Sequence, residues 1–369
     1  MRYTITFLAL CLMVFSCKKQ PDPVAVRNAT IDSTVLAFQK KLYQNQVDSV
    51  FSKNKFNAIV SVSNDGQKIY EKSNGFENFV SKAKLGTSSV FPIASLSKQF
   101  TAVLVLLQQD AGRLSTEDFV SKYLPEFHKP GYDKITIHQL LTHTSGISDF
   151  GESLQFASGT DYGYSNKGYL YLGEIVAKAS GKPFDQNLKE LFTKCGMQHS
   201  STATLFKGPH FASAHTGNTT NSTEVANMPA RLAEPSISTP AGGILSTVND
   251  LHTWNQMLYG GKILKPETLS LFKKNYVTRK HYVLGDVGYG YGIMSNIGEP
   301  EAYFHTGYVK GAPSLLVYYP ETKTSVVILS NFANEGKGKE FIFLPHRKVK
   351  DLADAVENTV VELRREMLK

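Results

Sequence analysis

The alternation of apolar and polar residues along the chain predicts a mixture of helices and strands. From Ile31 to about Ser52, apolar residues recur at the three- to four-residue spacing of a helix. The runs FNAIVSVS and QKIYEKS follow, on either side of the turn Asn64-Asp65-Gly66. A turn of this composition between two strand-like runs predicts a β-hairpin.

The remaining chain alternates between the two patterns. A helix is expected from about Phe100 to Asp110, with Gly112 as its stop signal. Between about Leu114 and Ala241 the pattern indicates short helices and loops. After it come a helix at DLHTWNQMLYGG, strands at GYGYGIMSN, EAYFHTG, PSLLVYYP and TSVVILSN, and an amphipathic helix at VKDLADAVENTVVELRREMLK.

This order of segments predicts an α+β protein. We expect residues 31–94 and 242–369 to share one antiparallel sheet flanked by helices, and residues 95–241 to form an inserted, mostly helical domain. A cleft between two such parts is where ligands usually bind.

The first seventeen residues differ from the rest of the chain. MRYTITFLALCLMVFSC has an early arginine and then an apolar run too short to span a bilayer, which indicates a secretory signal over residues 1–17. The end of this run resembles the lipobox of bacterial lipoproteins. Cys17 would then carry lipid, residues 18–30 would be a linker, and the protein would be exported and lipid-anchored in the cell envelope. The alternative is a plain signal peptide with Cys17 incidental.

Composition excludes several classes of protein. Of three cysteines, only Cys195 would remain in the folded body, so no internal disulfide and no cysteine cluster for zinc is expected. The formal net charge is +8, but no cluster of Lys and Arg interleaved with aromatics suggests nucleic acid. The 369 residues fit one large domain or two closely joined ones.

The first candidate for chemistry is Ser95-Leu96-Ser97-Lys98, at the start of an apolar helix. Residues three apart share a helix face, so Ser95 and Lys98 should be neighbours. Serine needs a base to become a nucleophile, and lysine can be that base once burial or positive charge lowers its pKa. Ser97 points elsewhere, as a helix-start or packing hydroxyl. Alone, this motif arises often by chance, and a helix-start serine is usually a cap.

Two further motifs could complete such a site. In Tyr164-Ser165-Asn166, the tyrosine could exchange a proton with a nucleophile or leaving group, and the asparagine could orient lysine and substrate. In His305-Thr306-Gly307, a cleft-lining strand could present backbone N–H groups, with the glycine permitting close approach. Taken singly, the first could be an ordinary turn and the second a strand that bends at a glycine.

The three motifs together resemble the S-x-x-K, Y-x-N and K/H-T-G set of the penicillin-recognising serine hydrolases. This group includes class C β-lactamases, D,D-carboxypeptidases and related esterases. FPIASLSKQFTA, ITIHQLLTHTSGI, TPAGGILSTVNDL and FHTGYVKGAPS also resemble family text, and the resemblance covers roughly residues 31–335. It implies a β-lactamase/transpeptidase-like fold and no cofactor.

The resemblance also implies roles at matching positions. Ser95 would be the acylated nucleophile, and Lys98 and Tyr164 would share general-base and general-acid duty. Asn166 would bind the substrate amide. His305, Thr306 and Gly307 would form the opposite wall, and the backbone N–H groups of Ser95 and Tyr308 would form the oxyanion hole.

Other chemistries are less well supported. His143 with Asp149 could complete a Ser–His–Asp triad, but no G-x-S-x-G elbow occurs, and the matching LLTHTSG segment of the family looks structural. A metal site is not expected either. The pairs His138/His143 and His210/His215 are spaced five apart, which does not place both on one helix face.

The third motif departs from many family members. His305 replaces a common lysine, and a partly charged histidine binds a carboxylate less firmly. Tyr308 replaces a common Ser or Thr and could crowd the pocket or stack on a substrate. The sequence therefore predicts a cell-envelope serine hydrolase acting on an amide or ester of a small molecule or peptide. A promiscuous carboxylesterase and a non-catalytic penicillin- or muropeptide-binding protein are the alternatives.

Overall fold

An antiparallel sheet forms the centre of the molecule. The computed structural model describes residues 22–54, 57–217, 221–235 and 237–369. Within these ranges, eight strands pair antiparallel in the order β2-β1-β13-β12-β11-β10-β9-β8. Their bounds are β1 (Ala58–Asn64), β2 (Gln67–Asn74), β8 (Val277–His281), β9 (Gly285–Tyr289), β10 (Met294–Asn296), β11 (Tyr303–Val309), β12 (Ala312–Tyr319) and β13 (Thr324–Ser330).

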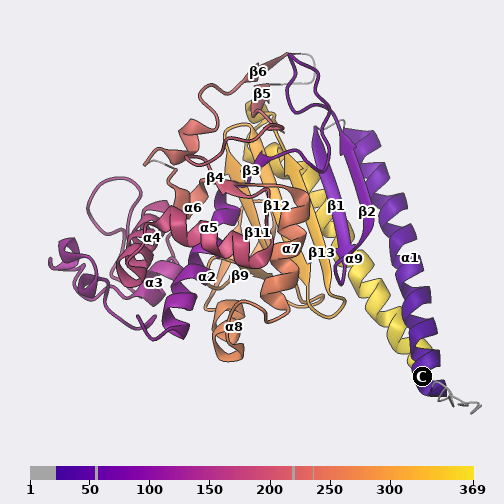
Figure 1. Cartoon of the computed structure of the whole chain (residues 1–369), viewed down its shortest axis with the longest axis horizontal. Helices are drawn as coiled ribbons and strands as arrows, with labels where there is room; N and C mark the ends of the chain where they lie inside the picture. Colours follow the sequence, from indigo (N-terminus) through magenta and orange to yellow (C-terminus); the bar gives the residue numbers. More distant parts are fainter. Residues whose placement is uncertain (1–21, 55–56, 218–220, 236) are drawn as a thin grey trace, which may run out of the picture.

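The sheet joins the two ends of the chain, as the sequence predicts. β1 pairs along its whole length with β13, so the early hairpin lies beside the late strands (Figure 1). Side chains alternate between the two faces: Ile59 packs with the helices of the insertion, whereas Val60 and Val62 pack on the opposite side.

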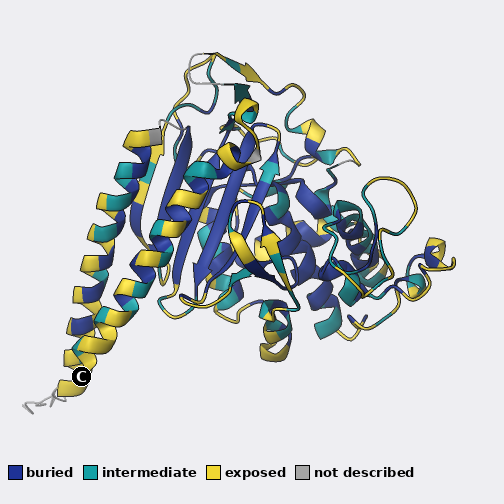
Figure 2. Cartoon of the chain, turned by 180° about the vertical axis from the view of Figure 1, so that it is seen from behind, coloured by how far each residue is buried: buried dark blue, intermediate teal, exposed yellow. Residues whose placement is uncertain are grey.

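Two long helices cover one face of the sheet. α1 (Pro23–Asn54) and α9 (Lys339–Leu368) pack against each other over the sheet (Figure 2). Their buried apolar side chains form one cluster with those of β1, β12 and β13. Tyr43 and Val47 of α1 and Val349 and Val356 of α9 are buried there. The first turns of α1 and the last turns of α9 extend past the edge of the sheet (Figures 1 and 2).

The other face carries the inserted region. Its helices are α2 (Ser97–Asp110), α3 (Ile137–Leu141), α4 (Asn166–Ser180), α5 (Phe184–Cys195) and α6 (Thr239–Gly242). Two helices of the C-terminal part, α7 (Val248–Tyr259) and α8 (Pro266–Lys273), share the same hydrophobic core, and α7 packs on β13 and β1. Short 3₁₀ turns lie at η1 (Ala94–Leu96), η2 (Val120–Lys122), η3 (Pro125–Phe127), η4 (Ala230–Ala233) and η5 (Glu335–Lys337).

Two small sheets tie the insertion to the terminal parts. In one, β7 (Ile244–Ser246) pairs with β3 (Phe91–Pro92) and β4 (Ser201–Thr202). In the other, β5 (His215–Gly217) pairs with β14 (Phe332–Ala333) and β6 (Ser222–Glu224). The inserted segment is therefore held at two places besides its covalent ends.

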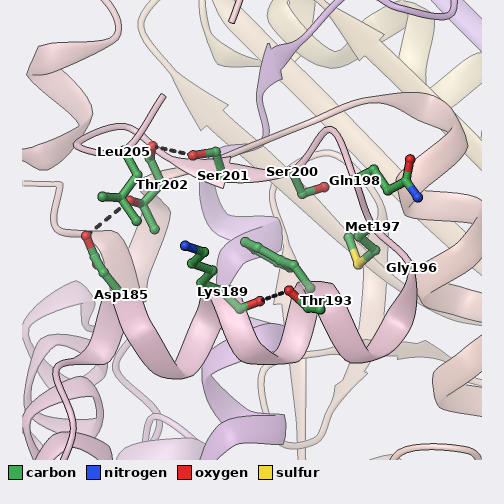
Figure 3. A pocket seen from close by; sticks show the side chains of 11 residues that line it. Asp185, Lys189, Thr193, Gly196, Met197, Gln198, Ser200, Ser201, Thr202 and Leu205 are labelled. Atoms are coloured by element: carbon green, nitrogen blue, oxygen red, sulfur yellow. Dashed lines mark hydrogen bonds between the residues drawn. The ribbon is translucent and has the colours of Figure 1, made fainter. Parts of the chain in front are cut away.

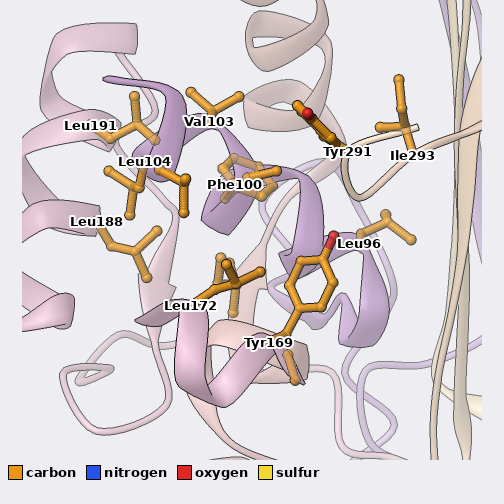
Figure 4. Packing of buried hydrophobic residues seen from close by; sticks show 14 of the residues in the cluster. Leu96, Phe100, Val103, Leu104, Tyr169, Leu172, Leu188, Leu191, Tyr291 and Ile293 are labelled. Carbon is orange, nitrogen blue, oxygen red and sulfur yellow. The ribbon is translucent and has the colours of Figure 1, made fainter. Parts of the chain in front are cut away.

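Helix α2 lies at the centre of the helices on this face of the sheet, and it is apolar on nearly every side. Phe100, Val103 and Leu104 pack against Leu172 of α4 and Leu188 of α5, among other side chains (Figure 4). A helix that is apolar all round must be buried all round. Its first residues, including Ser97 and Lys98, are consequently buried as well. Ser97 serves as a packing hydroxyl, accepting a hydrogen bond from the Ile244 N–H at 3.2 Å.

Both long helices begin earlier than the sequence predicts. α1 starts at Pro23, so residues 23–30 are helical rather than part of a linker. Proline is favoured in a first helical turn. The residues that follow Pro23 are stabilised as a helix because α1 packs on α9. α9 starts at Lys339, so that Pro345 lies inside the helix. Local propensity disfavours a proline at such a position, and the sequence therefore does not predict this early start. Strand β8 is also absent from the sequence prediction.

Cys17 and its signal lie outside the described residues, and among the described helices none could cross a membrane.

Candidate active site

A cleft of about 520 Å³ brings the three sequence motifs together. Ser95 opens into it from one side, with Tyr164 and Asn166 next to it, and His305, Thr306 and Tyr308 lie on the opposite wall. The lining is completed by Ala94, Arg231, Ile237, Ala241, Gly242, Arg279, His281, Tyr282, Met294, Val309, Lys310 and Phe343.

The nucleophile segment is held in an unusual backbone conformation. Ala94 has a φ of +49°, a left-handed value that non-glycine residues seldom adopt. It turns the chain sharply from β3 into η1, whose second residue is Ser95. Because Ala94 is buried, the surrounding structure maintains this strain, as is common at functional sites.

Lys98 lies next to Ser95, one helical turn further along the chain, and is fully buried. Its Nζ is 3.2 Å from Ser95 Oγ, 2.8 Å from Asn166 Oδ1 and 2.7 Å from the carbonyl oxygen of Ala241. Burial lowers the pKa of Lys98 to about 7, although the Asp149 carboxylate opposes this shift. A large fraction of the lysine is therefore neutral at physiological pH.

The partners of Lys98 also aim its lone pair. A neutral amine has two N–H donors, and the two oxygens of Asn166 and Ala241 accept them, since neither oxygen can donate. The remaining position on nitrogen faces Ser95 Oγ. In this form Lys98 can only accept the serine proton, which is the arrangement a general base requires.

Tyr164 is the second proton-carrying group beside Ser95. Its hydroxyl makes a hydrogen bond with Ser95, and its ring lies 4.8 Å from Lys98 Nζ. Burial raises the pKa of Tyr164 well above its ordinary value, and the bond to Ser95 offsets this only in part. Tyr164 thus keeps its proton near neutral pH, while Lys98 readily loses one.

Asp149 anchors the Tyr164 segment. Its carboxylate accepts hydrogen bonds from Ser165 Oγ, Asn166 Nδ2 and the Lys167 N–H, at 2.9 to 3.0 Å. Asn166 therefore bridges Asp149 and Lys98, and one Nδ2 hydrogen remains for a ligand. His143 has other partners, the Ser165 N–H and Tyr289 Oη. In the part of the chain that the structure describes, His143 thus makes no hydrogen bond to Asp149 or Ser95, which disfavours the Ser–His–Asp arrangement.

Gly307 lets β11 approach the nucleophile segment. A Cβ atom at this position would lie 2.3 Å from the carbonyl oxygen of Ile93 and 2.3 Å from Ser314 Oγ. Ser314 Oγ itself donates to the Ile93 carbonyl at 2.9 Å. β10 pairs only with the first two residues of β11, so the edge from His305 onward is open toward Ser95. The oxyanion role of the Ser95 and Tyr308 N–H groups stays a prediction.

His305 and Thr306, the two polar side chains of the β11 wall, are uncharged, and the hydrogen bonds around them fix their orientation. Burial, with Lys98 nearby, holds the pKa of His305 well below its usual value. His281 accepts the N–H groups of Val283 and Leu284 on Nδ1, so its proton is on Nε2, which is 3.4 Å from Thr306 Oγ1. Because His281 donates to Thr306, the threonine hydroxyl hydrogen is left for a ligand.

Arg279 lines the cleft but belongs to none of the three motifs, and it lies on strand β8, which the sequence pattern does not predict. Its guanidinium is 5.1 Å from the centre of the Tyr162 ring and 5.7 Å from that of Tyr289. Its Nε is buried without a hydrogen-bond partner, and no described carboxylate lies within ion-pair distance of the side chain. A cation of this kind in a cleft is a candidate for binding an anionic ligand group.

Tyr308 is held to one side of the cleft. Its hydroxyl donates to Glu335 and accepts from the Gly311 N–H, and its ring lies 6.0 Å from Phe343 of α9. The ring therefore narrows the cleft from a fixed position. Phe343 is a further lining residue that the sequence analysis missed, since it lies in the unpredicted first turns of α9.

A second hollow of about 470 Å³ lies between α5 and β4, away from this chemistry (Figure 3). Asp185, Lys189 and Thr202 line it together with apolar side chains, and Thr202 Oγ1 donates to Asp185 at 3.1 Å. None of the motif residues contributes to it. In the described ranges no group of His, Cys, Asp and Glu side chains could hold a metal ion, and Cys195 is a buried free thiol.

The comparisons with known proteins agree with the family that the three motifs indicate. The sequence matches the family described as Beta-lactamase over residues 42–342. The chain therefore belongs to the β-lactamase family, a family of serine hydrolases that includes penicillin-binding proteins.

Curated relatives are similar over most of the chain. A penicillin-binding protein of Bacillus subtilis is 27% identical over 331 residues, which cover 79% of this chain and 72% of the relative. A β-lactamase of Lysobacter lactamgenus is 29% identical over 267 residues, covering 66% of this chain and 64% of the relative. The chain thus spans about two thirds of the length of these relatives.

Solved structures show the same fold. A penicillin-binding protein homologue from Pyrococcus abyssi superimposes with a TM-score of 0.70 at 24% identity, over 79% of this chain and 73% of the homologue. A D-amino acid amidase from Ochrobactrum anthropi gives a TM-score of 0.70 at 19% identity, over 87% of this chain and 99% of the amidase. A class C β-lactamase gives a TM-score of 0.68 at 22% identity, over 85% of this chain and 96% of the β-lactamase. The predicted β-lactamase/transpeptidase-like fold is confirmed.

Proposed function

We propose that this protein hydrolyses an amide or ester through an acyl-enzyme on Ser95, and that its substrates carry a carboxylate. The observation that carries the proposal is the position of Lys98. A buried lysine with a lowered pKa directs its only free lone pair at a serine that opens into a cleft. Activated nucleophiles are characteristically arranged in this way.

The reaction follows from the proton positions. Ser95 Oγ attacks the substrate carbonyl carbon while its proton moves to Lys98 Nζ. The tetrahedral intermediate then collapses, the bond to the leaving amine or alcohol breaks, and the Tyr164 hydroxyl gives that group a proton. The proton held on Lys98 then passes to the Tyr164 oxygen, which restores both groups to their starting states. Water attacks the ester carbonyl of the acyl-enzyme, and its proton returns to the leaving Ser95 Oγ.

The charge of the cleft supports a carboxylate-bearing substrate. Arg231, Arg279 and Lys310 line it, and among the described lining residues there is no Asp or Glu. His305 is neutral and buried, so the attraction would come from Arg279, with the Thr306 hydroxyl as a neutral donor. The relatives named penicillin-binding protein and β-lactamase suggest a peptide ending in a D-amino acid, or a β-lactam, as the class of substrate.

The test is a substrate panel with the purified protein and a Ser95→Ala control. The panel contains a peptide ending in D-Ala-D-Ala, a penicillin, a D-amino acid amide and a neutral short-chain acyl ester. We expect turnover of at least one carboxylate-bearing member and a loss of roughly 10⁴-fold or more in Ser95→Ala. Cleavage of the neutral ester alone would favour the carboxylesterase alternative. Binding without turnover that survives Ser95→Ala would favour the non-catalytic one.

We further propose that the protein is exported and lipid-anchored through Cys17, which would place the enzyme near peptidoglycan. The sequence features that support this are the apolar run of residues 1–17 and its lipobox-like end. Metabolic labelling with a fatty acid tests it. We expect label in the wild-type chain and none in Cys17→Ala, whereas equal labelling of both would contradict the anchor.

A further inference from the structure

A continuous line of buried hydrogen bonds connects the Tyr164 segment to the β11 wall. It starts at the Ser165 N–H, which is 3.1 Å from His143 Nδ1. His143 Nε2 is 3.1 Å from Tyr289 Oη, and Tyr289 Oη is 3.3 Å from His305 Nε2. The line ends where His305 Nδ1 lies 2.5 Å from the Thr306 carbonyl oxygen.

The two backbone ends determine where each proton lies. The Ser165 N–H can only donate, so His143 Nδ1 accepts and, in a neutral ring, the proton is on Nε2. The Thr306 carbonyl can only accept, so His305 Nδ1 carries the proton and Nε2 is bare. His143 therefore donates to Tyr289, and Tyr289 donates to His305. The Tyr169 hydroxyl, which donates to the Leu141 carbonyl, is a second acceptor within reach of Tyr289.

Both imidazoles are held neutral, as this assignment requires. Burial, with Lys98 nearby, keeps the pKa of both His143 and His305 well below the usual value. His143 also contacts the catalytic segment directly, because its ring lies 4.3 Å from that of Tyr164. Its backbone adopts a left-handed φ of +59°, which turns the side chain of this loop residue into the interior.

We propose that His143 and Tyr289 are positioning residues that fix the distance and orientation between the Tyr164 segment and the β11 wall through a one-directional line of hydrogen bonds. The proposal rests on the proposed function, since it assigns these residues to the reaction at Ser95. Neither residue touches the reacting atoms. Their effect is transmitted by Ser165, which stands between Tyr164 and Asn166, and by His305, which precedes Thr306.

The molecule contains a matched control for this arrangement. His138 Nδ1 and Tyr291 Oη form a second Tyr–His hydrogen bond, at 2.7 Å, between a half-buried histidine and a buried tyrosine. His138 and Tyr291 come from the same two chain segments as His143 and Tyr289. Their bond reaches neither the Tyr164 segment nor β11. Tyr291→Phe thus removes a hydroxyl that is also hydrogen-bonded to a histidine, without interrupting the proposed line.

The first experiment measures the tautomers in the full chain without substrate. Proton–nitrogen correlation spectra of the histidine side chains, assigned with single His→Gln variants, report which ring nitrogen carries the proton. We expect His143 as the Nε2–H tautomer and His305 as the Nδ1–H tautomer. In Tyr289→Phe the bare His305 nitrogen loses its donor and its resonance should move, whereas Tyr291→Phe should leave it in place. The opposite tautomer at either histidine would overturn the proposal.

The second experiment measures kcat/KM for a substrate that the wild type turns over. Tyr289→Phe should reduce it about tenfold, the size expected when a buried acceptor loses its donor, and Tyr291→Phe less than twofold. Equal losses in both variants would contradict the positioning role. If Tyr289→Phe does not fold, the tautomers of His143 and His305 in the wild type still test the direction of the hydrogen-bond line. If no substrate is hydrolysed, the proposed function fails while the spectra test the hydrogen-bond line separately.

Discussion

The two walls of the cleft are built in different ways. On the nucleophile wall, the two reacting side chains, Ser95 and Lys98, come from one short motif, and the hydrogen bonds of Lys98 to Asn166 and Ala241 are short. The β11 wall has only a short motif of its own. Its properties come from side chains outside the motif, on strands β8 and β9 of the same sheet, including Arg279, His281 and Tyr289.

This difference separates chemistry from selectivity. The nucleophile wall contains the groups that make and break bonds, and its motif predicts them. The β11 wall decides which substrates are held, and its charge does not come from the motif histidine, which is buried and neutral. Changes at the first wall should therefore reduce turnover of every substrate, and changes at the second should depend on the charge of the substrate.

The largest effect, after loss of the nucleophile itself, is expected for Lys98→Ala. Removing a general base typically costs 10²- to 10⁴-fold, and here it also removes the hydrogen bonds that order Asn166, so we expect a loss of about 10³-fold in kcat/KM. Steady-state kinetics on each active substrate measures this. A loss confined to carboxylate-bearing substrates would contradict the division between the walls.

The pH dependence tests the same base without a mutation. Lys98 accepts the serine proton only when neutral, and its pKa is about 7. We therefore expect kcat/KM to decrease about tenfold per unit as pH falls below about 7, and to level off above it. His143, His281 and His305 should not titrate in this range, because burial lowers their pKa values. A profile that is flat from pH 5 to 9 would argue against Lys98 as the base.

Gly307→Ala should disturb the spacing between the two walls. The added methyl group would meet the Ile93 carbonyl and Ser314 Oγ, so β11 must move away from Ser95. Displacement of a reacting geometry by about 1 Å costs on the order of 10²-fold, and we expect that loss in kcat/KM for all substrates. Gly86→Ala is the control, since its added methyl group has open space around it. Wild-type kinetics in Gly307→Ala would contradict the close approach.

Arg279→Gln should have the smallest effect and the most selective one. Loss of one charged hydrogen-bonding partner costs about 1.5 to 3 kcal/mol, so KM for a carboxylate-bearing substrate should rise roughly 10- to 100-fold. KM for a neutral ester should change less than about threefold. Lys280→Gln removes the same charge from the next residue, which does not line the cleft. Equal effects on charged and neutral substrates would show that Arg279 does not bind the carboxylate.

How far the sequence predicts this protein depends on how local each feature is. The hairpin at Asn64-Asp65-Gly66 and the strands at EAYFHTG, PSLLVYYP and TSVVILSN follow from turn chemistry and alternation, and the structure confirms them. The single strand predicted at GYGYGIMSN is wrong, since this run contains the end of β9, a turn and the antiparallel strand β10. The Ser95–Lys98 contact follows from helical spacing. The start of α1 at Pro23 could not be predicted in the same way, because packing on α9 stabilises it rather than local propensity.

The missed site residues have the same explanation. Arg279 lies on β8, a short strand with alternating exposure that carries little local signal. His143 was expected to be structural, and the left-handed φ that turns it inward is invisible in the sequence. Its link to His305 runs through Tyr289, which is 146 residues away from it. Only the folded chain places these three side chains in line.

The most direct test of the central claim is the intact mass of the protein after exposure to a penicillin and, separately, to an activated ester, beside Ser95→Ala. The account predicts an added acyl mass with at least one reagent, located on the peptide that contains Ser95 and absent from the variant. It also predicts that the adduct forms faster above pH 7 than below it. An adduct of equal extent in Ser95→Ala, or attachment at another residue, would contradict an acyl-enzyme at Ser95.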